Sequence, residues 1–60
     1  MSRLVLTRKT NESVIIHKDD ETLVVLNVNR IDRNQVRLSF EAEEDIKIDR
    51  SEIFFHDEQH

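Results

Sequence analysis

Two short segments at opposite ends of the chain each carry an arginine at or near their end. Leu4-Val-Leu-Thr-Arg-Lys9 opens the chain and Ile46-Lys-Ile-Asp-Arg50 lies near its close. A guanidinium group has forked donors that match phosphate oxygens and base edges. If the two segments lie side by side, Arg8 and Arg50 can face one ligand. Nucleic acid is therefore the first class of ligand to consider.

The size of the chain limits what one copy can do alone. A domain of 60 residues buries only about 60% of its unfolded surface. Small proteins usually compensate with disulfides, a metal or oligomerisation, and this chain has no cysteine. We therefore expect a homodimer, the commonest oligomer. No apolar run at the N-terminus is long enough for a signal peptide or a membrane span, so we expect a cytoplasmic protein without a membrane partner.

The charge is unevenly distributed along the sequence. The formal net charge is −4, which argues against indiscriminate binding of nucleic acid. Residues 1–18 nevertheless carry four basic residues against one acid, whereas residues 40–60 carry two against eight. The positive charge is therefore local, and it lies where the first arginine segment ends.

Apolar and polar residues alternate with period two along most of the chain, which predicts half-buried antiparallel strands. The clearest case places Val36, Leu38 and Phe40 on one face. Ser51 is suited to cap a short helix. We predict a single all-β domain over residues 1–60, with strands at about 3–8, 13–17, 22–30, 34–40 and 46–49 and a C-terminal helix at about 51–57.

The connections are predicted from polar clusters, because the chain contains neither glycine nor proline. Residues 18–21 and 31–34 have the composition of hairpin loops, in which Asn and Asp supply the backbone angles that glycine often provides. Five short strands leave two open edges. Pairing of the first and last strands between two copies would cover these edges.

Four motifs in this order resemble the carbon storage regulator (CsrA/RsmA) family of small bacterial RNA-binding regulators. They are the opening Leu-x-Leu-Thr-Arg-Lys, Glu12 before an apolar strand, Asn34-Gln-Val-Arg-Leu38, and the closing Arg50-x-Glu-Ile53. The resemblance covers roughly residues 4–54. It implies a five-stranded antiparallel homodimer with interleaved chains, in which the first strand of one copy neighbours the fifth strand of the other.

The resemblance also implies a function. Family members bind GGA-containing hairpin loops near the ribosome-binding sites of mRNAs, control translation or message stability, and are sequestered by small regulatory RNAs. The family's contact positions correspond here to Leu6, Thr7, Arg8, Lys9, Ile48, Asp49, Arg50 and Glu52. Among them, Arg50 is our candidate for direct contact with RNA, and Arg8 and Lys9 are candidates for phosphate attraction. Cofactors, metals and catalysis are not expected, because no residues combine a nucleophile, a base and oxyanion donors.

Several departures from the family pattern support an alternative. Glu41-Ala-Glu-Glu44 replaces a loop of the Asn-Ala-Pro-Lys type, and Asp49 replaces a histidine before the arginine. The segment between Ile16 and Asn34 is also longer than usual, which suggests an extended hairpin. Because acids repel phosphate, the alternative is a divergent homologue with weak or altered RNA binding that acts through protein partners, including a protein antagonist, or through mixed dimers. In a plainer interpretation, Arg50 pairs with Glu52 or Asp49 on a solvated surface.

Overall fold

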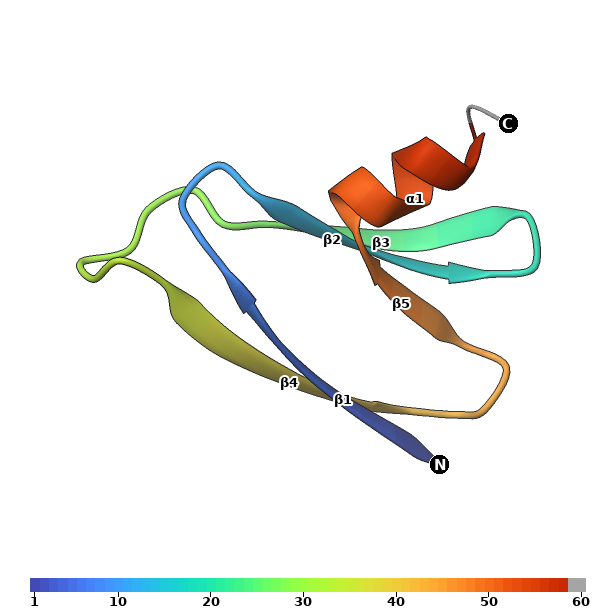
Figure 1. Cartoon of the computed structure of the whole chain (residues 1–60). Helices are drawn as coiled ribbons and strands as arrows, with labels where there is room; N and C mark the ends of the chain where they lie inside the picture. Colours follow the sequence, from blue (N-terminus) through green and yellow to red (C-terminus); the bar gives the residue numbers. More distant parts are fainter. Residues whose placement is uncertain (59–60) are drawn as a thin grey trace.

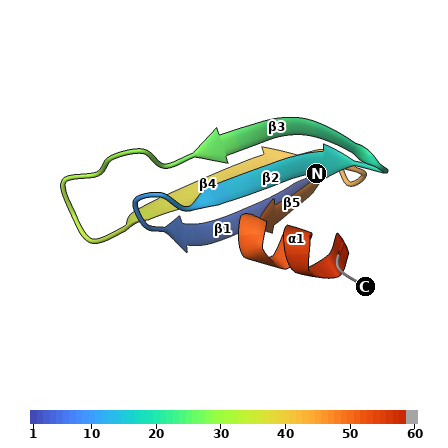
Figure 2. The same ribbon diagram turned by 90° about the horizontal axis from the view of Figure 1, so that it is seen from above.

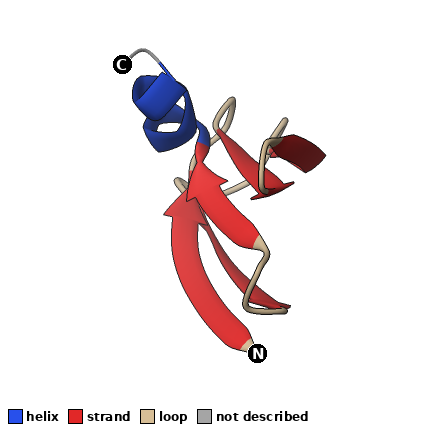
Figure 3. Ribbon diagram, turned by 90° about the vertical axis from the view of Figure 1, so that its right-hand side faces the viewer, coloured by secondary structure: helices blue, strands red, loops and turns tan. Residues whose placement is uncertain are grey.

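The computed structural model describes residues 1–58 and shows a mostly β structure with a short C-terminal helix, as predicted (Figures 1 and 3). The strands are β1 (Ser2–Arg8), β2 (Ser13–Lys18), β3 (Glu21–Asn27), β4 (Val36–Ala42) and β5 (Lys47–Arg50). Helix α1 (Ser51–Glu58) follows β5 directly. The negative charge of Glu52 in its first turn interacts favourably with the helix dipole.

The strands form two antiparallel sheets. Strands β1 and β4 pair with each other, with Leu6 opposite Leu38. Strand β2 is the centre of the second sheet, in the order β3-β2-β5, with Ile16 opposite Ile48 on β5. The short turn at residues 43–46 carries the chain from β4 to β5 and so from the first sheet to the second (Figures 1 and 2).

The third and fourth strands differ from their predicted bounds. Strand β3 ends at Asn27 instead of residue 30, and β4 begins at Val36 instead of residue 34. The prediction of a hairpin loop at 31–34 is wrong, because β3 and β4 belong to different sheets. After β3, Val28 forms two main-chain hydrogen bonds with the turn between β1 and β2. Its N–H donates to the Glu12 carbonyl (2.9 Å), and its carbonyl accepts from Asn11 N–H (2.7 Å).

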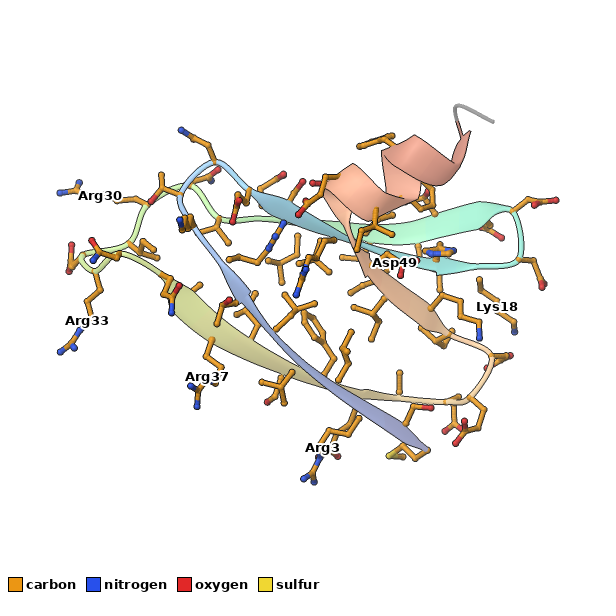
Figure 4. The ribbon with its side chains drawn as sticks, in the orientation of Figure 1. Arg3, Lys18, Arg30, Arg33, Arg37 and Asp49 are labelled. Carbon is orange, nitrogen blue, oxygen red and sulfur yellow. The ribbon has the colours of Figure 1, made fainter. Side chains whose placement is uncertain are left out.

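One chain buries only a small apolar core. Along β4 the inward residues are half-buried and the intervening ones exposed, which confirms the alternation predicted there. Side chains from both sheets project into the space between them (Figure 4). Full burial is nevertheless limited to a few apolar side chains, namely Leu6, Val14, Ile15 and Val28. By contrast, Val5 of β1 and Val25 of β3 remain about half exposed (52% and 50%).

Two residues with positive φ form the tight turns. Asn11 (φ 72°) lies between β1 and β2, and Asp19 (φ 54°) lies between β2 and β3. Asn and Asp adopt this left-handed region more readily than other residues with a Cβ atom, so both replace glycine here, as predicted for the loop that contains Asp19. None of the described helices is long and apolar enough to cross a membrane.

Candidate nucleic-acid interface

The end of β1 and the start of α1 meet through a forked ion pair. Arg8 Nη1 and Nη2 donate to the two carboxylate oxygens of Glu52, each at 2.9 Å. The same guanidinium donates to the main-chain carbonyls of Ser13 (3.2 Å) and Thr7 (3.0 Å). Two segments that lie at opposite ends of the sequence are therefore joined within one chain.

The Arg8–Glu52 pair is asymmetric in its exposure to solvent. The side chain of Arg8 is only 5% exposed, whereas that of Glu52 is 57% exposed. Hydrogen bonds from Arg8, with a contribution from the backbone at the helix start, lower the pKa of Glu52 to about 2. The pKa of Arg8 is raised by the same pairing. With its donors used internally, Arg8 positions the surrounding residues and presents little of itself to a ligand.

Arg50 presents its charge to solvent beside this ion pair. It is exposed at the end of β5, opposite Val14 of β2. Its positive charge also helps to lower the pKa of Glu52, so Arg8 and Arg50 flank one carboxylate. Within residues 1–55, whose side chains the structure describes, no ion pair is found for Arg50. The plainer interpretation, in which Arg50 pairs with Glu52 or Asp49, is therefore not what the structure shows.

The other predicted contact residues of the first strand lie on both faces of β1. Thr7 and Lys9 are exposed, while Leu6 is buried. The main-chain N–H of Lys9 donates to Glu12 Oε1 at 2.6 Å. This contact closes the turn and does not involve the Lys9 ammonium group. Glu12 therefore holds the turn between β1 and β2 and also lies 3.6 Å from Arg8 Nε.

A hollow separates β1 from β5. It has a volume of about 270 Å³, and both strands line it together with α1 through Leu4, Val5, Leu6, Ile48, Asp49, Arg50 and Ile53. No hydrogen-bonded ladder joins β1 to β5 in the part of the chain that the structure describes. Each strand therefore keeps one open edge at the hollow, with main-chain donors and acceptors available.

Asp49 is partly engaged by a histidine on the neighbouring strand. His17 Nε2 and Asp49 Oδ2 are 2.7 Å apart, and the ring of Phe54 lies against the imidazole with centroids 4.9 Å apart. Asp49 lies below α1 (Figure 4). Sequence reasoning missed this contact, because the two residues lie 32 positions apart and only the sheet brings them together.

Three of the four acids at residues 41–45 are paired at the far end of the molecule, one on β4 and two in the β4–β5 connection. Glu41 bonds Arg3 at 2.9 Å, Glu44 bonds the N-terminal ammonium at 2.9 Å, and Asp45 bonds Lys18 at 3.0 Å. The pKa of Glu44 is lowered by the ammonium group and that of Asp45 by Lys18. These pairings reduce the repulsion that the acidic run would otherwise exert on a nearby phosphate.

The model of the CsrA global regulator protein family matches residues 3–58, which is nearly the whole chain. The chain belongs to the CsrA family. Proteins called translational regulator CsrA are also similar to it. The one from Borreliella burgdorferi (strain ZS7) is 45% identical over 51 residues, and the one from Alkaliphilus metalliredigens (strain QYMF) is 41% identical over 51 residues.

These matches cover 85% of this chain in both cases, but only 58% and 63% of the two CsrA relatives. The chain therefore spans about three fifths of the length of these relatives. No solved structure matches it. The family assignment thus rests on sequence, and the site geometry described above is that of this CsrA-family chain itself.

Proposed function

We propose that this protein is a post-transcriptional regulator that binds GGA-containing RNA hairpin loops near mRNA ribosome-binding sites and controls translation or message stability. The observation that carries the proposal is an exposed Arg50, which has no ion pair among residues 1–55, beside the open edges of β1 and β5. Base edges in a single-stranded loop are accessible to main-chain and side-chain donors. Arg50 supplies charged donors, and main-chain groups near Thr7 and Ile48 contact guanine where the pairing of β1 with β5 of a second copy stops.

Each of the remaining predicted contact residues has a distinct role in this proposal. Lys9 attracts phosphate, and the Arg8–Glu52 pair fixes the end of β1 against the helix that follows Arg50. Leu6 keeps β1 packed, and Asp49 is restrained by His17. The chemistry is recognition without a reaction, so small regulatory RNAs with the same motif are competing ligands.

The proposed active form is an interleaved homodimer, in which β1 of one copy adds to β5 of the other. The open edges at the hollow and the half-exposed apolar residues of β1 and β3 support this arrangement. Main-chain pairing would satisfy those edges, and a second copy would cover Val5 and Val25. We expect sedimentation equilibrium to give the mass of two chains at micromolar concentration. The mass of a single chain under these conditions would contradict the dimer.

RNA recognition is tested by comparing two hairpins that differ only in the loop. One carries GGA in its loop, and the other has the same stem but carries the complementary triplet in its loop. We expect the GGA hairpin to bind more tightly by about 100-fold or more, because specific sites exceed non-specific ones by several kcal/mol. A gel-shift titration measures both affinities. Equal affinities would refute recognition of the triplet.

The alternative function, action through protein partners or mixed dimers, is not favoured. It was motivated by the acids at 41–45 and by Asp49, and all of these acids except Glu43 are engaged by Arg3, the N-terminus, Lys18 or His17. The relatives' shared name, translational regulator, also supports the RNA proposal.

A further inference from the structure

The loop at residues 28–35 is tied down at both of its ends. At its start, Val28 exchanges two main-chain hydrogen bonds with the β1–β2 turn, through Asn11 and Glu12. At its end, Val36 pairs with Arg8 across the β1–β4 ladder. The residues that hold the two ends, Asn11, Glu12 and Arg8, all belong to the segment that contains Lys9. The loop is therefore held beside this segment at one end of the molecule (Figure 1).

This end of the molecule gathers exposed positive charge. Arg30 and Arg33 extend from the loop into solvent (Figure 4), and Lys9, which follows β1, is exposed as well. Among residues 1–55, none of these three cations takes part in an ion pair. One acid, Asp32, lies in the loop, and the carboxylate of Glu12 is turned towards the Lys9 N–H and Arg8.

Two of these cations, Lys9 and Arg33, line a broad, open depression, and Arg30 extends from the same loop. Its volume is about 920 Å³, and its lining consists of Lys9 from the turn and Arg33, Asn34 and Gln35 from the loop. Charged and amide donors thus surround one shallow surface. Guanidinium, ammonium and amide groups are the side chains that contact the phosphates and sugars of nucleic acids without reading bases. An open shape suits a backbone that runs across the surface better than it suits a small molecule.

We propose that Lys9, Arg30 and Arg33 form a phosphate-binding surface for the RNA backbone adjoining the recognised loop. This inference rests on the proposed RNA-binding function and extends it beyond the GGA triplet. Lys9 belongs to the end of β1 and also lines the depression, so the surface is continuous with the candidate interface.

The double variant Arg30→Gln/Arg33→Gln tests the surface on two RNAs. One is a short single strand that contains GGA, and the other carries the same loop on a long stem with flanking nucleotides. On the long RNA we expect about 5- to 10-fold weaker binding at low salt. We also expect the slope of log affinity against log salt concentration to be less steep by about 1.4, because each of the two lost phosphate contacts contributes about 0.7. On the short RNA the affinity should change little.

The matched control is Arg3→Gln/Lys47→Gln, which removes the same net charge from exposed sites away from the loop. Unchanged binding of the long RNA by the loop variant, or an equal loss in the control, would overturn the proposal. Circular dichroism of both variants verifies that they remain folded. With both variants folded, a loss of RNA affinity found only in the loop variant is a local effect of Arg30 and Arg33.

A long RNA with an altered triplet separates this inference from the proposed function. Phosphate contacts do not depend on base sequence, so the loop variant should bind this RNA more weakly than the wild type at low salt. If the wild type shows no preference for GGA but this difference persists, specific recognition fails and the phosphate surface stands. If the wild type binds neither RNA, both are refuted.

Discussion

Replacing Arg50 with alanine is expected to weaken binding of a GGA hairpin by about 10- to 100-fold while the fold is retained. A well-placed guanidinium contact to a base contributes about 1–3 kcal/mol of discrimination. Arg50 is exposed and makes no ion pair within the described side chains, so its removal costs the structure little. A fluorescence titration with labelled hairpin measures the change.

Lys47→Ala is the matched control for this variant. Lys47 is an exposed cation on the same strand, at the end away from α1. Its loss should reduce affinity far less, and only through long-range charge that is screened by salt. Comparable losses in the two variants would show that Arg50 acts through net charge alone. An unchanged affinity in Arg50→Ala would remove it from the site.

Replacing Arg8 with alanine is expected to lower the free energy of unfolding by about 2 kcal/mol. The substitution removes the two bonds to Glu52 and the donors to the Ser13 and Thr7 carbonyls, all made by a side chain that is almost fully buried. For a chain of this size, the melting temperature should fall by about 10 °C. Urea unfolding at fixed protein concentration measures the difference, with exposed Lys9→Ala as control.

The Arg8–Glu52 ion pair also makes the free energy of unfolding depend on pH. Because the pKa of Glu52 is lowered from 4.5 to about 2 in the folded chain, its stabilising effect is present in full above about pH 4.5. As the pH falls from about 4.5 to about 2, the unfolded chain takes up the proton first, and the effect is lost. The stability advantage of wild type over Glu52→Gln should therefore shrink in this range. A constant difference between the two proteins down to pH 2 would contradict this assignment.

The alternation of residues predicted the strands better than it predicted their partners. Period two identifies which face of a strand is buried, and on β4 it did so correctly. It carries no information on the neighbouring strand, so a local hairpin was expected where β4 instead pairs with β1, far earlier in the sequence. Helix α1 was predictable because a serine and an acid at its start are local signals for a helix N-terminus.

The candidate site was predictable in residue type but not in how each side chain is used. Both arginines were expected to face the ligand, Arg50 by direct contact and Arg8 by phosphate attraction, and the structure gives Arg8 to an internal pair and leaves Arg50 exposed. The difference depends on Glu52, a partner 44 positions away from Arg8 that only the folded chain brings within reach. Arg30 and Arg33 were overlooked because they lie outside the strands, although the extra length of that segment was the available signal.

The two anchors of the 28–35 loop also bear on how such proteins diversify. The entropy of closing a loop rises slowly with length, by about 0.6 kcal/mol for each doubling. With Val28 and Val36 fixed by main-chain bonds, residues can be added or exchanged between them while both sheets keep their register. Evolution and protein engineering alike can therefore tune the footprint of this chain on its target by grafting new loops at this position.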